Sequence, residues 1–320
     1  MNIVIWGAGG IGCYYGSRLI NAGANVTFVA RGKHLQALQA HGLTVKHPEF
    51  TFNGSVNAVD EATWLTQSSP ENTDLVILCL KSTATGDALL RAKRWLQASQ
   101  CYVLSLQNGV DNENQLCDII ESHRVLGGLA VRIGAHITQP GHIEATGIAK
   151  IIFGAWPNHS RQHHKSYTGH EFCQQLKILF TQALIDNHLN DNIQKEIWKK
   201  LLINAGVNPI SALTELDTQT LTSDNVFSAT VYQLMQETAR AAHADGVEIS
   251  SSDIDAMFEL ICGFDAIKTS MLVDFENRKP LELDAISGAV IQRCRSLNSP
   301  AYTTELIDQL LKTKINKCYG

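Results

Sequence analysis

Three polar side chains that can carry chemistry recur at four-residue intervals in EIWKKLLINAGVNP, residues 196–209. Lys200, Asn204 and Asn208 are the residues concerned, and residues four apart lie along one side of an α-helix. The stripe offers an ammonium group and two amides to a polar ligand. The spacing alone equally fits a surface lysine followed by asparagines that end a helix before Pro209.

A glycine motif at the N-terminus has the spacing of a dinucleotide-binding loop. Gly7, Gly9 and Gly12 form G-x-G-x-x-G in IVIWGAGGIG, after a β-rich run and at the start of a helical stretch. The first glycine permits a tight turn, the second lets a pyrophosphate approach the backbone, and the third lets the helix pack against the strand. The alternative is a glycine-rich turn without a ligand. The expected cofactor-binding loop is Gly7, Ala8, Gly9, Gly10, Ile11 and Gly12.

The end of the second β-rich run indicates which nicotinamide cofactor binds. NAD enzymes usually place an acidic residue there to hold the ribose hydroxyls. Here NVTFVARGKH has Arg31 and Lys33 and no acid. Since a guanidinium group binds a phosphate bidentately, the sequence favours NADP(H) over NAD(H). A solvated basic loop is the alternative.

Two further polar residues end β-rich runs. Lys81 closes DLVILCLK, and Asn108 closes YVLSLQN. Because ligands bind at the carboxyl edge of open α/β sheets, we expect both residues to border the nicotinamide. Either could instead cap a loop.

Strands and helices alternate in the first half of the chain. The runs NIVIWG, NVTFVAR, DLVILCLK, CYVLSLQNG and RVLGGLAVRI read as strands, followed by the β-like runs HIEA and AKIIFGAW; helical stretches include 10–22, 84–98 and 111–121. This predicts a parallel, doubly wound sheet. From about residue 170 the pattern is helical, at 193–206, 223–245, 253–274, 280–297 and 303–316, with Pro280 in a first turn. We therefore expect an N-terminal Rossmann-type α/β domain at 1–189 and an all-α domain at 190–320.

Composition and charge indicate a globular enzyme and not a nucleic-acid-binding or membrane protein. The 320 residues carry a net charge of −5 and are 44% hydrophobic and 18% charged, which is typical of a globular enzyme and argues against a nucleic-acid partner. The eight cysteines form no C-x-x-C pair, and the apolar run at the N-terminus is too short for a signal peptide or a membrane span. We expect a cytoplasmic protein with reduced thiols and no membrane partner. The histidine-rich stretch 157–171 is expected to be an exposed loop, although His159 and His163 have metal-like spacing; no metal site is expected.

The motifs taken together resemble the ketopantoate reductase (2-dehydropantoate 2-reductase) family along nearly the whole chain. The segments that carry the resemblance are GAGGIG, ARGKHL, CLKS, LQNGV, GAHITQPGHIEATG, WKKLLINAGVNPISAL, TSMLVDFENRKPLELDAISGAV and SPAYTTEL. This set in this order is far more specific than the glycine loop. The resemblance implies NADPH-dependent reduction of 2-dehydropantoate to pantoate, for pantothenate and coenzyme A biosynthesis.

The resemblance also implies the catalytic roles. Lys200 donates the proton to the forming alkoxide, which an ammonium group beside a ketone oxygen can do. Glu282 holds the substrate and organises the lysine region. Read without the family, Glu282 is a glutamate in the first helical turn after Pro280, where the helix dipole favours it.

The remaining site residues follow in the same way. The resemblance implies that Asn204 and Asn208 bind carboxylate and hydroxyl oxygens of the substrate, and that Ser270 binds its carboxylate. Asn108 is expected to meet both substrate and cofactor, and Ala135 to approach the cofactor through its backbone. Ser270 could alternatively be an ordinary helical serine.

Two departures from the family pattern bear on the substrate. The best-known members have an asparagine three residues before the serine, where this chain has Ile267, and an Asn-Gly pair where it has Asp217-Thr218-Gln219. Fewer polar groups would then meet the substrate. Reduction of another 2-oxo acid is therefore the alternative, and a non-catalytic NADP(H)-binding redox sensor is the rival from another class. We expect a monomer or a homodimer.

Overall fold

The computed structural model describes residues 1–156 and 166–319. Contacts divide the chain into two compact units, one of Met1–Gln107 with Asn112–Ile193 and one of Asn108–Asp111 with Gln194–Gly320. The short segment Asn108–Asp111 thus groups with the second unit, although the chain on both sides of it belongs to the first. Of the histidine-rich stretch, His159 and His163 lie outside the described residues.

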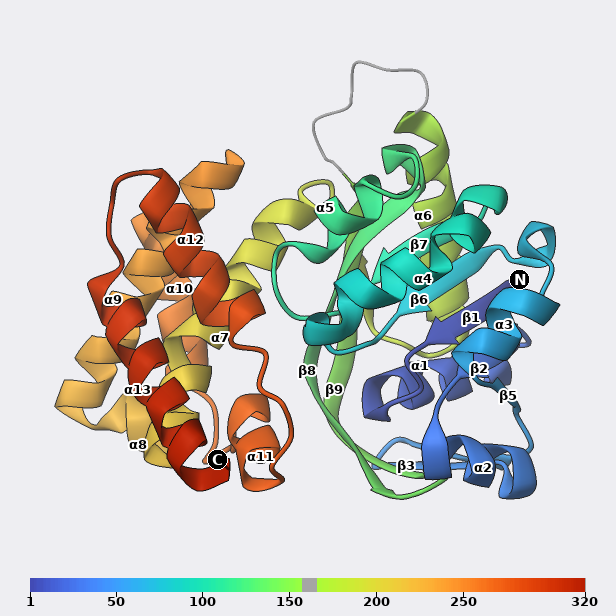
Figure 1. Ribbon diagram of the computed structural model, residues 1–320, viewed down its shortest axis with the longest axis horizontal. Coiled ribbons are helices and arrows are strands. Elements are labelled where there is room, and N and C mark those ends of the chain that lie inside the picture. The colour runs from blue at the N-terminus through green and yellow to red at the C-terminus, as the bar shows by residue number, and fades with distance from the viewer. Residues whose placement is uncertain (157–165, 320) are drawn as a thin grey trace. The chain divides into compact units, whose positions relative to one another are not determined.

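The described strands of the first unit form a single sheet in the order β4-β3-β9-β8-β7-β6-β1-β2-β5, with β10 paired to β9 (Figure 1). The six neighbouring strands β8, β7, β6, β1, β2 and β5 run parallel to one another, as the Rossmann prediction requires. The strands are β1 (Asn2–Trp6), β2 (Asn25–Val29), β3 (Leu43–His47), β4 (Phe50–Gly54), β5 (Asn57–Val59), β6 (Leu75–Leu78), β7 (Tyr102–Ser105), β8 (Val125–Gln139), β9 (His142–Ala155) and β10 (Asn187–Leu189).

Antiparallel strands extend this parallel sheet, so the sheet is mixed. β8 and β9 form a long hairpin that turns at Gly141, whose φ of +81° favours glycine. The runs HIEA and AKIIFGAW are two parts of the one strand β9. The short strands β3 and β4 also pair antiparallel, and β3 pairs parallel with β9.

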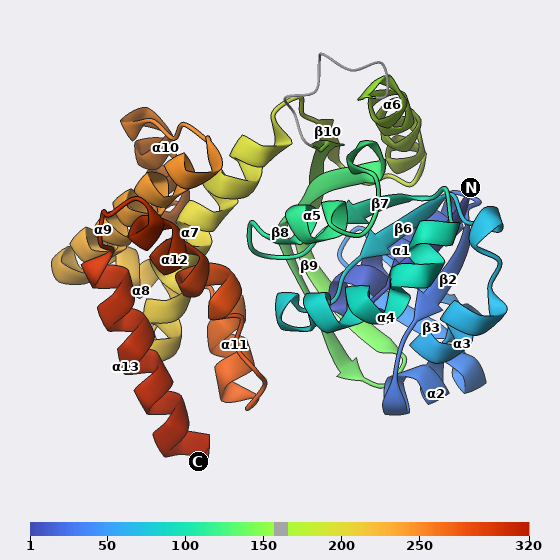
Figure 2. The same cartoon turned by 45° about the horizontal axis from the view of Figure 1, so that its top comes forward.

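Helices cover both faces of the sheet, as a doubly wound fold requires. They are α1 (Gly10–Asn21), α2 (Gly32–His41), α3 (Glu61–Gln67), α4 (Thr85–Ala98), α5 (Asn112–Cys117) and α6 (Ser166–Gln182). Figures 1 and 2 show α1 on one side of the strands and α3 and α4 on the other.

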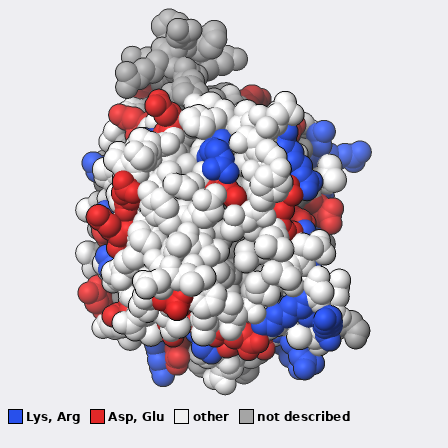
Figure 3. All heavy atoms as spheres, turned by 90° about the vertical axis from the view of Figure 1, so that its left-hand side faces the viewer, with Lys and Arg blue, Asp and Glu red and all other residues white. Residues whose placement is uncertain are grey.

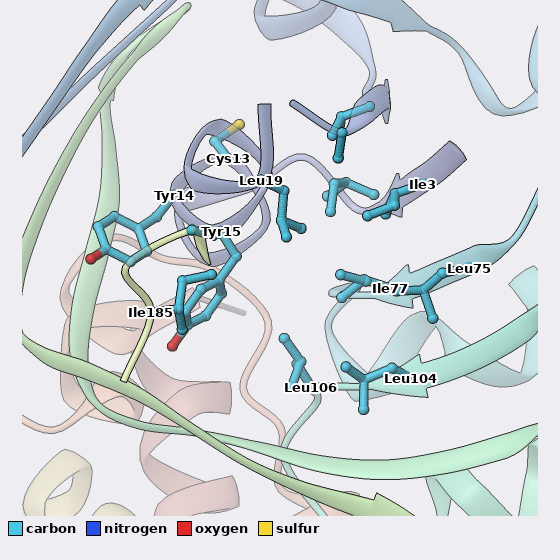
Figure 4. Close-up of a cluster of buried hydrophobic side chains, with 14 of the residues drawn as sticks. Ile3, Cys13, Tyr14, Tyr15, Leu19, Leu75, Ile77, Leu104, Leu106 and Ile185 are labelled. Atoms are coloured by element: carbon cyan, nitrogen blue, oxygen red, sulfur yellow. The ribbon is translucent and has the colours of Figure 1, made fainter. Parts of the chain in front are cut away.

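Each face of the sheet has its own apolar layer because successive strand residues point to opposite sides. Leu19 of α1 packs with Ile3 of β1 and Ile77 of β6 in one buried cluster, drawn in Figure 4. On the opposite face, the ring centroids of Trp6 and Trp64 are 5.0 Å apart, and those of Trp64 and Trp95 are 4.8 Å apart. The first layer holds α1, and with it the glycine loop, against the sheet, whereas the tryptophans pack α3 and α4 against the other face.

The second unit is helical. Its helices are α7 (Ile193–Thr214), α8 (Thr218–Ser223), α9 (Asn225–Ala242), α10 (Ser251–Cys262), α11 (Ser270–Glu276), α12 (Ala289–Ser296) and α13 (Tyr302–Tyr319). Figure 3 looks onto one side of this unit, where charged side chains lie mainly around the edge. On α13 the side chains of Tyr302, Leu306 and Leu310 are 74%, 59% and 46% exposed and form an apolar stripe of the kind through which helices pair. The expectation of a monomer or a homodimer stays a prediction.

Three expected helices differ from the observed ones because tertiary packing overrides local signals. α7 continues through Pro209 to Thr214, and its residues around the proline, such as Val207 and Ile210, are buried. The expected helix from Pro280 instead begins with a π-helical turn at Asp284–Gly288, so Glu282 precedes the helix. The expected helix 253–274 is divided into α10 and α11, and Thr269 caps α11 by accepting a hydrogen bond from the Leu272 amide at 3.2 Å.

All eight cysteines are free thiols. Among the described helices, none is long and apolar enough to cross a lipid bilayer.

Candidate active site

The glycine loop has the local geometry that a dinucleotide requires. Gly7 has a φ of +107°, and a Cβ atom there would lie 2.7 Å from the backbone of Cys79. A Cβ on Gly12 would lie 2.4 Å from the carbonyl oxygen of Gly7 and 2.8 Å from Ile5 Cγ2. Glycine at both positions therefore lets α1 begin in direct contact with β1.

Gly9 differs from its neighbours because the space in front of it is open. It is the N-cap of α1, and a Cβ atom there would meet no described heavy atom within 4 Å. The amides at the start of α1, including those of Gly10 and Ile11, have no partner within the helix and carry its positive dipole end. A ligand that accepts hydrogen bonds could therefore approach these amides at Gly9.

Strand β8 passes directly over the start of α1. A Cβ atom on Gly10 would lie 2.1 Å from the carbonyl oxygen of Ala135, and Ala8 is buried in the turn beside it, where its amide donates to the Val29 carbonyl oxygen at 3.0 Å. The backbone of Ala135 is thus brought to the glycine loop, as its expected approach to the cofactor requires.

Strand register brings the other expected cofactor residues to the same edge. Trp6 pairs with Val29 of β2 and with Leu78 of β6, so these parallel strands end level with one another. Exposed Arg31 follows β2 as the N-cap of α2, and exposed Lys81 follows β6. Glycine loop, arginine and lysine therefore share the carboxyl edge of the sheet.

Gln107, in the segment LQNGV, has a structural role that its sequence pattern did not predict. Its side-chain amide donates to the Leu80 carbonyl oxygen at 2.9 Å and to Thr85 Oγ1 at 2.7 Å, and the residue is only 5% exposed. It thereby fixes the turn that carries Lys81. The signal available in the sequence was a polar residue at the end of a predicted strand.

His34 is a second residue that the sequence did not single out. Its Nδ1 accepts a hydrogen bond from the Gly141 amide at 3.1 Å, and its Nε2 lies 3.6 Å from Cys13 Sγ. Burial lowers the pKa of His34, while a hydrogen bond with the Ala8 backbone raises it. The neutral imidazole ties the start of α2 to the hairpin turn and to the glycine loop.

The second unit brings together Lys200, Glu282 and Asn108. The Asn108 side-chain amide donates to Glu282 Oε2 at 3.0 Å. Burial lowers the pKa of Lys200 from 10.5 to about 8, and the negative charge of Glu282 raises it. An ammonium group in this environment is a suitable general acid near neutral pH because its proton can be transferred at little cost.

Asn204, Asn208 and Ser270 are the other expected substrate-binding residues. The two asparagines follow Lys200 at one and two turns along α7. Asn208 is 4% exposed, and its side-chain nitrogen has no partner among the described residues. A buried amide with unused donors is costly unless a ligand accepts from it. Ser270 is exposed as the first residue of α11, and no described hydrogen bond joins it to the Lys200 cluster.

The two departures from the family pattern are joined to each other. Thr218 Oγ1 donates to the Asp265 carbonyl oxygen at 2.8 Å and accepts from the Ile267 amide at 3.2 Å. Asp217 caps α8 by accepting from the Thr220 amide at 2.8 Å. The polar groups of this pair of segments are thus engaged within the protein, while the Ile267 side chain is 48% exposed.

Within the described ranges, no group of three or more histidine, cysteine or acidic residues is placed to hold a metal ion.

Comparison with known proteins covers both units. Residues 3–158 match the family Ketopantoate reductase PanE/ApbA, and residues 192–315 match Ketopantoate reductase PanE/ApbA C terminal. The 2-dehydropantoate 2-reductase of Pyrococcus abyssi (strain GE5 / Orsay) is 30% identical over 314 residues, which are 98% of each chain.

Solved structures show the same fold over the full length. The crystal structure of 2-dehydropantoate 2-reductase from Geobacter metallireducens GS-15 has a TM-score of 0.86 at 26% identity, covering 98% of this chain and 100% of that one. A D-mandelate dehydrogenase in a ternary structure with NADH and anilino(oxo)acetate has a TM-score of 0.86 at 20% identity, covering 99% of both chains. At that identity it shares the fold alone.

Two glycine substitutions separate folding from cofactor binding. We expect Gly12→Ala to lower the free energy of unfolding by about 1–3 kcal/mol, because its methyl group is forced against β1. Gly9→Ala should leave stability within about 0.5 kcal/mol yet weaken dinucleotide binding, because its methyl group occupies the open space in front of the amides. Thermal melts and fluorescence titration with NADPH measure the two effects. Unchanged NADPH affinity in Gly9→Ala would contradict the placement of the pyrophosphate.

Proposed function

Because the chain belongs to the ketopantoate reductase family, whose members are oxidoreductases, we propose that it reduces 2-dehydropantoate to pantoate with NADPH, the reductive step that pantothenate and coenzyme A biosynthesis requires. The observation that carries the proposal is the cluster of Lys200, Glu282 and Asn108 in the second unit, where burial lowers the pKa of the Lys200 ammonium group and the Glu282 carboxylate raises it. A protein that only senses NADP(H) has no use for such a cluster.

NADPH is proposed as the cofactor on the strength of the sheet edge in the first unit. Gly9 and the start of α1 offer amides to the pyrophosphate, and Arg31 stands exposed at the end of β2. A guanidinium group there can bind a 2′-phosphate with two parallel hydrogen bonds. Bound NADPH supplies the hydride.

Proton transfer is assigned to Lys200. Its Nζ donates a hydrogen bond to the ketone oxygen, stabilises the negative charge that develops there, and transfers its proton to the alkoxide. Glu282 keeps the ammonium group protonated in its buried environment, and Asn108 holds the Glu282 carboxylate in place. Asn204 and Asn208 are proposed to bind substrate oxygens along α7, and Ser270 to bind the carboxylate.

Reduction of a less polar 2-oxo acid is the second candidate function. It is favoured by Ile267, whose side chain is 48% exposed, and by Thr218, whose hydroxyl group already hydrogen-bonds within the protein. A substrate that lacks the hydroxyl group of 2-dehydropantoate would lose nothing at this position.

The proposed activity is tested by nicotinamide absorbance with 2-dehydropantoate, pyruvate and 2-oxoisovalerate as separate substrates. We expect turnover to be fastest with 2-dehydropantoate, and kcat to fall by about 10²–10⁴-fold in Lys200→Ala, which loses the general acid, while NADPH still binds. Lys199→Ala is the matched control, since it removes the neighbouring ammonium group. Preferred turnover of 2-oxoisovalerate would establish the second candidate, and turnover of no 2-oxo acid would overturn both.

The pH dependence of kcat reports on Lys200 directly. Because the proton donor must be protonated and its pKa is about 8, we expect kcat for reduction to be level below that pH and to fall about tenfold per unit above it. In Glu282→Gln the charge that raises this pKa is gone, so the fall should begin at lower pH. A shift toward higher pH in this variant would refute the role given to the carboxylate.

Arg31→Ala is expected to weaken NADPH binding far more than NADH binding. Loss of a charge-assisted hydrogen-bonding group costs about 1.5–3 kcal/mol, which is about 10- to 100-fold in Kd. Lys33→Ala serves as the comparison, because it removes an exposed positive charge two residues away. Equal losses for the two cofactors in Arg31→Ala would contradict the contact with the 2′-phosphate.

A further inference from the structure

The segment Asn108–Asp111 follows β7 along the chain but is held by residues of the second unit. At one end, Asn108 hydrogen-bonds to Glu282. In the middle, Gly109 has a φ of +98°, and a Cβ atom there would lie 3.1 Å from the Ala285 side chain. The segment therefore packs closely against the π-helical turn that follows Glu282.

Arg293 holds the other end of the segment. Its Nη2 lies 2.6 Å from Asp111 Oδ1, and its Nε donates to both carboxylate oxygens of Asp245 at 2.9 Å. The guanidinium carbon also lies 5.3 Å from the centroid of the Trp198 ring. The Arg293 side chain of α12 thus contacts the segment, the 3-10 turn that follows α9, and α7. Its contact on α7, Trp198, lies two residues before Lys200.

The geometry of Arg293 makes this a rigid anchor. The residue is 9% exposed, and a guanidinium group stays protonated and presents donors in a fixed plane. The carboxylates of Asp111 and Asp245 compensate its buried charge, and removing one partner from such a group is costly because the charge is then left poorly paired.

We propose that Arg293 is a positioning residue for the reduction, which acts by fixing Asp111 and hence the whole segment, so that the Asn108 amide holds the Glu282 carboxylate beside Lys200. Among the described residues, the ion pairs of Arg293 are with Asp111 and Asp245 and not with a residue given a catalytic role. The proposal rests on the proposed function for its effect on turnover, whereas the anchoring of the segment is independent of that function.

Two isosteric variants distinguish positioning from a merely structural role. Asp111→Asn and Asp245→Asn each remove one carboxylate charge from Arg293, but only the first removes the charged contact between Arg293 and the segment itself. The Asp245 side chain is 18% exposed and that of Asp111 is 40% exposed, so Asp245→Asn should lower the melting temperature at least as much. We expect the opposite order for kcat, with a loss of about 10- to 100-fold in Asp111→Asn, as for a small misplacement of a catalytic group.

The pH profile and amide exchange supply readouts that loss of stability would not move. In Asp111→Asn a less well-placed Glu282 raises the pKa of Lys200 less, so the fall of kcat at high pH should begin at lower pH than in the wild type or in Asp245→Asn. Hydrogen exchange at residues 108–111 should be faster in Asp111→Asn than in Asp245→Asn, in the full-length protein.

Four results decide between these possibilities. Equal losses of kcat in the two variants, or a wild-type pH profile together with wild-type exchange in Asp111→Asn, would overturn the proposal. Faster exchange at 108–111 with the shifted pH profile would support it. If the wild-type chain reduces no 2-oxo acid, the proposed function fails on its own, and protected exchange at 108–111 in Asp111→Asn would then overturn the anchoring itself.

Discussion

The second unit is organised around the cost of burying the Lys200 ammonium group. Removal of this group from water disfavours its charged form, and a carboxylate nearby restores it; the resulting pKa of about 8 is the balance of these two effects. A balance of this kind depends on distance. The Asn108 amide hydrogen-bonds to the Glu282 carboxylate, and in the proposed mechanism the segment Asn108–Asp111, the π-helical turn at Asp284–Gly288 and α12 keep this carboxylate in place.

The first unit differs from the second because the proposed binding of a pyrophosphate depends on backbone amides of the glycine loop. A pyrophosphate can reach the amides of α1 only where side chains are missing, and the open space at Gly9 contrasts with the crowded positions of Gly7, Gly10 and Gly12. Here the absence of a Cβ atom serves two purposes. At three glycines it permits close packing of α1, β1 and β8, and at the fourth it leaves room for a ligand.

Local sequence patterns predicted those features that depend on neighbouring residues. The glycine loop, the strands β1, β2, β6 and β7, and the line of Lys200, Asn204 and Asn208 along α7 all follow from spacing of a few residues. The patterns failed where distant packing decides. α7 passes through Pro209 because its surroundings are buried, and β3 pairs with β9 although it is nearly a hundred residues away in the chain. His34 and Gln107 were missed because their partners, Gly141 and Leu80, are far from them in sequence.

The sequence by itself determined the fold class, because the alternation of strands and helices is set by residues that lie close together along the chain; the glycine loop was predicted from its local spacing, and Lys200 as proton donor from the family resemblance. Only the tertiary structure decided that Glu282 stands before a helix and that Asn108 and Arg293 secure its surroundings. The Asn108–Glu282 hydrogen bond joins residues 174 positions apart, and the Asp111–Arg293 contact joins residues 182 positions apart. A periodic sequence pattern cannot predict such pairs, because they form only where folding buries these charged and polar groups next to one another.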